Sequence, residues 1–107
     1  MTAPLYEEAA PIACSLRPAD LAGRLATIEA FRDDLVAVDE GPHGLLLRFA
    51  ERPGLRAEVE AFARAEKACC PFWGFAVEGD AALTLRWDAP PAAAHLLEEV
   101  RRRLAPG

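Results

Sequence analysis

Two adjacent cysteines and an acid that precedes them are the residues of this sequence best able to do chemistry. Glu66, Cys69 and Cys70 stand at positions i, i+3 and i+4, which a helix places on one face. Glu66 also continues the apolar stripe of the predicted helix, where an acid is costly unless it is paired or binds a ligand. We therefore expect these residues to form one site, with Glu66 as a ligand, a supporting acid or a proton shuttle.

A proline directly after the pair affects where the two sulfurs can lie. Consecutive side chains of a helix point about 100° apart, so an uninterrupted helix would separate them. Pro71 instead pushes Cys70 out of the α region, which ends the helix and allows both sulfurs to face one point. Phe72 and Trp73 follow and are expected to limit the access of water.

Thiolates are ligands of soft metal ions, and Cys14 is the third thiol of the chain. Three sulfurs from Cys14, Cys69 and Cys70 would form a trigonal site for Cu(I), Hg(II) or As(III). Zn(II) usually takes a fourth ligand, for which the sequence offers the imidazoles of His43 and His95. The sequence therefore predicts a cysteine cluster that binds or senses a thiophilic metal or metalloid ion as its cofactor.

Three other interpretations stay open. Vicinal cysteines can form a strained, labile disulfide, which would make the pair a thiol-redox centre. An organometal-processing enzyme would use Glu66 to move a proton while two thiolates hold the metal. In an interaction module the cysteines would be small core residues. We expect binding rather than catalysis, because a helix C-terminus and a nearby carboxylate disfavour a nucleophilic thiolate, whereas a metal displaces the thiol proton itself.

Three short motifs of the chain can be compared with those of known families: Ile12-Ala13-Cys14-Ser15-Leu16, the Leu-Arg-Pro-Ala-Asp-Leu stretch before the first helix, and Glu66-x-x-Cys69-Cys70-Pro71-Phe72. Over most of its length after residue 11 the chain resembles a small bacterial family, the C-terminal extension of MerR-type heavy-metal-responsive regulators, which also occurs as free-standing proteins. The resemblance implies heavy-metal resistance, with Cys14, Cys69 and Cys70 as matched positions. No helix-turn-helix is predicted here, so regulation would need a regulator protein or a homodimer.

Composition and charge exclude several classes of function. A net charge of −5 without a basic face argues against direct binding of nucleic acid. Apolar runs of a few residues are too short to span a membrane. The start of the chain lacks the charged and apolar regions of an export signal, and three cysteines are an odd number. We therefore expect a cytoplasmic protein with reduced thiols.

The periodicity of apolar residues predicts the elements that must position the site. Helical spacing follows Pro18, Pro53 and Pro90, and alternating spacing surrounds two turn-rich segments between these helices. The order is α-ββα-ββα, which predicts an α+β fold with a four-stranded antiparallel sheet and helices packed on one face. We expect residues 1–11 to be a flexible N-terminal arm and residues 12–107 to form a single domain.

The two ββα units, residues 35–70 and 72–104, predict an internal repeat. Leu45-x-Leu47-Arg48-Phe49 precedes Leu83-x-Leu85-Arg86-Trp87 by 38 positions. At the same offset Leu104 of the second unit corresponds to Glu66 of the first. The pattern fits a duplication, and it also fits two unrelated units that share hairpin and helix periodicity. In either case Glu66 stands where a core residue is expected.

Overall fold

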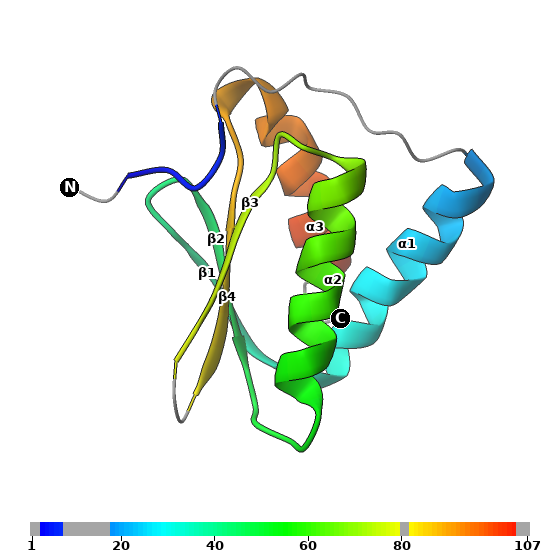
Figure 1. The fold of residues 1–107 in the computed structure, drawn as a ribbon, viewed down its shortest axis with the longest axis vertical. Coiled ribbons are helices and arrows are strands. Elements are labelled where there is room, and N and C mark those ends of the chain that lie inside the picture. The colour runs from blue at the N-terminus through cyan, green and yellow to red at the C-terminus, as the bar shows by residue number, and fades with distance from the viewer. Residues whose placement is uncertain (1–2, 8–17, 80–81, 105–107) are drawn as a thin grey trace.

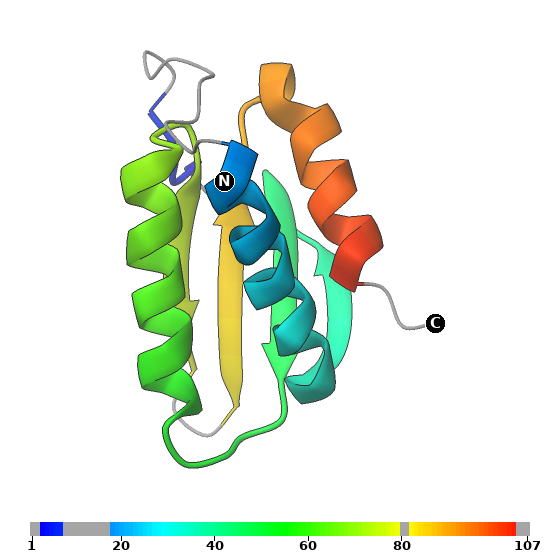
Figure 2. The ribbon, with the colours of Figure 1, turned by 90° about the vertical axis from the view of Figure 1, so that its right-hand side faces the viewer.

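Three helices cover one face of a four-stranded antiparallel sheet, and the α+β expectation is confirmed (Figures 1 and 2). The computed structural model describes residues 3–7, 18–79 and 82–104, and of residues 18–22 it describes the backbone alone. No helix in these ranges is long and apolar enough to cross a membrane. The elements are α1 (Pro18–Ala30), the 3₁₀ turn η1 (Phe31–Asp34), β1 (Leu35–Glu40), β2 (Gly44–Phe49), α2 (Leu55–Cys69), β3 (Gly74–Glu78), β4 (Leu83–Asp88), the 3₁₀ turn η2 (Pro91–Ala93) and α3 (Ala94–Leu104).

The strand order β1-β2-β4-β3 joins two hairpins through their second strands. Leu47 of β2 faces Leu85 of β4, and these residues correspond at the offset of 38 positions. Phe49 pairs with Leu83, and Leu45 pairs with Trp87. Because Leu45 corresponds to Leu83 and Phe49 to Trp87 at this offset, each pair contains the counterparts of the residues in the other pair. This register is the one expected if an approximate two-fold axis relates the hairpins.

The core lies between the sheet and the helices, as the alternation of apolar residues predicts. The inward side chains of β2 and β4 are 1–4% exposed, and α2 and α3 each bury one stripe. Leu96 of α3 is an exception among the large apolar side chains of the helices, because it is 38% exposed. Figure 2 shows α1 between α2 and α3 in front of the sheet. The buried strand residues are Leu45, Leu47, Phe49, Leu83, Leu85 and Trp87.

The second helix begins later than its proline suggests. Pro53 was predicted to start it, but α2 starts at Leu55 because Gly54 adopts a positive φ of 82°, which glycine tolerates and which interrupts the helix. The helix ends at Cys69, and Cys70 has left the helical region with φ −127° and ψ 80°. The break before Pro71 therefore lies where the sequence places it.

Residues 3–7 lie on the face of the sheet opposite to the helices (Figure 1). The Leu5 N–H donates to Asp88 Oδ2 over 3.0 Å, and Arg86 Nη2 donates to the carbonyl of Ala3 over 2.9 Å. Arg86 also pairs with Asp88, whose side chain is fully buried. These contacts concern the described part of the predicted N-terminal arm, and its other residues lie outside the described ranges.

Gly74 permits this close approach, and its replacement by alanine is expected to destabilise the protein. A Cβ at this position would stand 2.4 Å from the Leu5 carbonyl carbon and 2.5 Å from the Tyr6 nitrogen. Backbone must therefore shift, and overpacking of this kind costs about 1–3 kcal/mol. The free energy of unfolding, measured in urea, should fall by this amount in Gly74→Ala.

A chain that lacks residues 1–7 provides the control. Without the segment, alanine in a strand should be as stabilising as glycine or more so, because glycine loses more backbone entropy on folding. An equal cost of Gly74→Ala in the complete and shortened chains would contradict the contact.

Candidate functional site

The Cys-Cys-Pro-Phe segment forms a tight turn at the C-terminal end of α2. The Cys70 N–H donates to the Glu66 carbonyl over 2.8 Å, which completes the last helical hydrogen bond. The Trp73 N–H donates to the Cys70 carbonyl over 3.1 Å, so Pro71 occupies the second position of a β-turn, where its fixed φ is favourable. Lys67 Nζ donates to the carbonyls of Pro71 and Trp73 over 2.7 and 2.6 Å. The turn that carries the cysteines is therefore fixed by both backbone and side chain.

Glu66 and Cys70 line the same cavity. The cavity has a volume of about 330 Å³ and lies among the three helices above the sheet. Glu66 is 3% exposed and Cys70 is 6% exposed. Leu104, which corresponds to Glu66 in the second unit, is likewise 2% exposed. Glu66 is thus an acid in a core position, as its place on the stripe predicts.

Arg24 of α1 connects the acid to the first cysteine. Its Nη1 lies 3.6 Å from Glu66 Oε2, and its Nη2 lies 3.7 Å from Cys69 Sγ. The side chain of Arg24 is 18% exposed, so this guanidinium is largely removed from water. One cation therefore contacts two of the predicted site residues from a different helix.

Sequence reasoning did not find Arg24, although a signal was present. Arg24 stands four positions before Ile28, which is 3% exposed, and next to the half-buried Leu25. It therefore interrupts the apolar stripe of α1 as Glu66 interrupts that of α2. Opposite charges on the buried stripes of two helices indicate that the helices bring these charges together.

Burial raises the pKa of Glu66, and the Coulomb attraction of Arg24 opposes this effect in part. Desolvation is the larger of the two causes. The carboxyl group consequently keeps its proton at higher pH than an exposed glutamate does. Such a group can donate or accept a proton close to a bound ligand.

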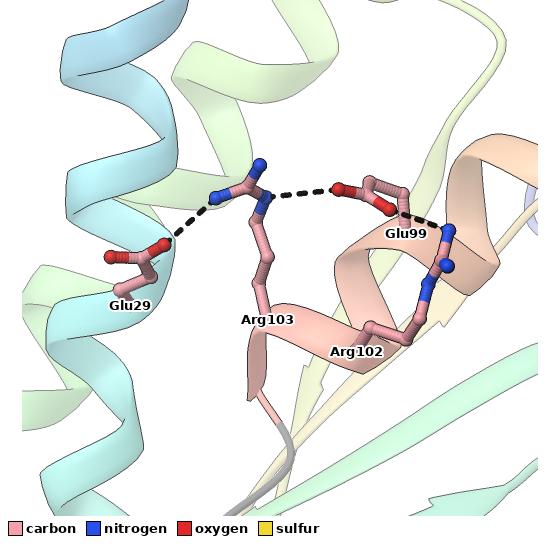
Figure 3. A network of polar contacts seen from close by, with 4 residues as sticks. All are labelled: Glu29, Glu99, Arg102 and Arg103. Carbon is pink, nitrogen blue, oxygen red and sulfur yellow. Dashed lines mark hydrogen bonds and ion pairs between the residues drawn. The ribbon is translucent and has the colours of Figure 1, made fainter.

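A network of ion pairs lies at the rim of the cavity, and one of them, Arg103–Glu29, connects α1 with α3 (Figure 3). Arg103 Nη1 lies 2.9 Å from Glu29 of α1, and Arg103 Nε donates to Glu99 over 3.2 Å. Arg102 also contacts Glu99, over 2.6 Å. Arg103 and Glu99 line the cavity as well. Because these side chains are 35–68% exposed, each pair contributes little to stability and can open at low cost.

The structure brings three of the four predicted ligands to one helix end. Glu66 and Cys70 face the cavity, whereas Cys69 is half-buried and contacts Arg24. Cys14 lies outside the described residues. Within residues 3–7, 18–79 and 82–104, no group of three or more His, Cys, Asp or Glu side chains is arranged to hold a metal ion.

Neither histidine lies at the cavity of the cysteines. His43 is half-buried in the turn between β1 and β2, where its ring meets the edge of Tyr6 at a centroid distance of 6.3 Å. His95 is exposed on α3. Neither residue lines the cavity that contains Glu66 and Cys70.

No family model, curated protein or solved structure matches this chain. The function is therefore inferred from the chemistry and geometry of the site itself.

Proposed function

We propose that this protein binds a thiophilic metal or metalloid ion, namely Hg(II), Cu(I), As(III) or Zn(II), through Cys69 and Cys70 with Cys14 as the third sulfur ligand. The observation that carries the proposal is the concentration of two thiols, a buried acid and a cation at the C-terminal end of α2. The corresponding end of α3 has Leu104 in place of Glu66. A purely structural role of the cysteines gives no reason for a charged pair at a core position.

The charges around the thiols suit a bound soft cation. Binding of such an ion releases the thiol protons and leaves thiolates. When three sulfurs take part, their combined negative charge is larger than the positive charge of a mono- or divalent ion. Arg24 beside Cys69 Sγ offsets this excess. Glu66 is placed to act as an accessory acid that receives a proton or supports a ligand.

We further propose that the protein acts in the cytoplasm, where reduced thiols persist. Its role would be to sequester the ion or to pass its presence to a regulator protein or to a second copy of the chain. The acidic net charge of −5 supports a protein or metal partner rather than nucleic acid.

Titration of the reduced protein with Hg(II), Cu(I) and Zn(II) tests this function. We expect a thiolate charge-transfer absorbance that saturates at one ion per chain, and we expect it to be lost in the Cys69→Ser/Cys70→Ser variant. The Cys14→Ser variant should bind more weakly, and its band should change because the number of sulfurs falls from three to two. If the Cys69→Ser/Cys70→Ser variant binds these ions as tightly as the wild type does, the proposed function is wrong.

A further inference from the structure

The cavity beside Cys70 is larger and more apolar than a bare ion requires. A soft ion held by two or three sulfurs fills its coordination sphere with the sulfurs themselves. The cavity of about 330 Å³ adjoins only one of the vicinal thiols, that of Cys70, and most of its wall is hydrocarbon. Its apolar side chains come from α1, from the turn that follows α2, from β4 and from α3: Leu25, Ile28, Phe72, Trp73, Trp87, Leu96 and Val100.

Aromatic rings form one side of this wall. The Phe72 and Trp73 ring centroids are 4.6 Å apart, and Trp73 meets Trp87 edge-to-face at 5.3 Å. A planar apolar group that entered the cavity would add further stacked or edge contacts to these rings. The charged and thiol side chains of the cavity, by contrast, are Cys70, the Arg24–Glu66 pair and the Arg103–Glu99 pair.

We propose that the ligand of this site is an organometal cation in which a soft metal carries one aromatic group, an inference that rests on the function proposed above. The metal binds Cys70, and the aryl group occupies the apolar cavity. Such a ligand uses the soft donor and the hydrocarbon wall together, whereas an inorganic ion leaves the wall in contact with water.

The binding step is a ligand exchange without oxidation or reduction. With phenylmercury chloride, the Hg–Cl bond breaks and a bond forms between mercury and the sulfur of Cys70. The thiol proton and the chloride leave to the solvent, and the carbon–mercury bond stays intact. The half-exposed Arg103–Glu29 pair joins α1 to α3 at the rim, so the two helices can separate there to admit the ligand (Figure 3).

Competition against free cysteine tests the proposal with three probes: phenylmercury, methylmercury and inorganic Hg(II). For each probe the affinity for the protein is divided by the affinity for free cysteine, which removes the intrinsic strength of the mercury–sulfur bond. We expect this ratio to be about tenfold higher or more for phenylmercury than for methylmercury, as for other apolar groups in fitted pockets. Equal ratios in the wild type overturn the proposal.

The two vicinal cysteines serve as matched variants. Cys70→Ser should abolish the preference for phenylmercury, because its thiol adjoins the cavity, whereas Cys69→Ser should keep the preference even though the affinity for Hg(II) falls in both variants. These measurements are made with Cys14→Ser as well, so that binding at Cys14 is recognised. A phenyl preference that persists in Cys70→Ser overturns the proposal.

A cavity-filling variant and a direct measurement complete the test. Leu25→Trp places an indole against the cavity and should remove the preference, whereas Val36→Trp adds the same ring at a position that is 67% exposed and should not. In the wild-type complex, nuclear Overhauser effects should connect the phenyl protons with Trp73 and Trp87, and their absence at full occupancy overturns the proposal without any variant. If none of Hg(II), Cu(I) and Zn(II) binds through Cys69 and Cys70, the proposed function fails, whereas binding of Hg(II) without a phenyl preference refutes this inference alone.

Discussion

Replacing Asp88 by alanine is expected to lower the free energy of unfolding by about 3–5 kcal/mol. Asp88 is fully buried, and Arg86, whose side chain is 11% exposed, contacts it through two nitrogens at 3.1 and 2.7 Å. The substitution leaves the guanidinium nearly buried without its carboxylate and removes the acceptor of the Leu5 N–H. Because a domain of this size is stable by about 5–15 kcal/mol, the variant should unfold at much lower urea concentration.

The other hairpin offers a matched control for this prediction. Arg48 corresponds to Arg86 at the 38-residue offset and pairs with Asp39 at 2.8 Å, but the two side chains are 56% and 47% exposed. Asp39→Ala should therefore cost less than about 1 kcal/mol. If Asp88→Ala and Asp39→Ala lower the free energy of unfolding by equal amounts, burial by the N-terminal segment is not what stabilises the Arg86–Asp88 pair.

Replacing Glu66 by leucine is expected to stabilise the protein by about 1–3 kcal/mol at pH 7, because the desolvation of its carboxylate is a larger effect than the attraction of Arg24. Glu66 is 3% exposed, and the second unit already has leucine at the corresponding position. Arg24 keeps its contact with Cys69 and some access to water, so its charge is not stranded. Urea unfolding of both proteins measures the gain.

The gain should depend on pH with a defined sign. Burial raises the pKa of Glu66 above its usual 4.5, so the folded protein holds this proton where the unfolded chain has lost it. The wild type therefore loses stability relative to Glu66→Leu as the pH rises through 4.5 and up to the raised pKa, and the gain is smallest in acid. Glu66→Gln, which keeps the shape without the charge, should remove the same dependence. A gain that does not change between pH 4 and pH 8 would show that desolvation of the carboxylate is not its cause.

The same variants indicate what Glu66 is for. If it supports the ligands of a metal ion, Glu66→Leu should bind Hg(II) about 10–100-fold more weakly while the fold becomes more stable. A more stable variant with unchanged affinity would make Glu66 a structural residue. Loss of stability in Glu66→Leu would mean that the pair with Arg24 outweighs its desolvation.

Local patterns were sufficient to predict most of the fold. Alternation in Leu45, Leu47 and Phe49 determines which strand face is buried, and the steps of three and four from Leu55 to Glu66 determine the buried stripe of α2. These periods follow from backbone geometry, so they can be read without knowledge of the neighbours. For the same reason the sequence alone identified Glu66 as an acid in a core position.

Tertiary structure decided which groups meet the site residues. Arg24 contacts Cys69 across 45 positions of sequence, and the Leu5 N–H reaches Asp88 across 83. The cavity beside Cys70 likewise arises from three helices packed over β4. Such contacts depend on the rotation and spacing of whole elements against each other, which no local period specifies. The sequence by itself therefore determined where the thiols and the acid lie along the chain, and only packing between distant elements gave them a cation and an apolar cavity.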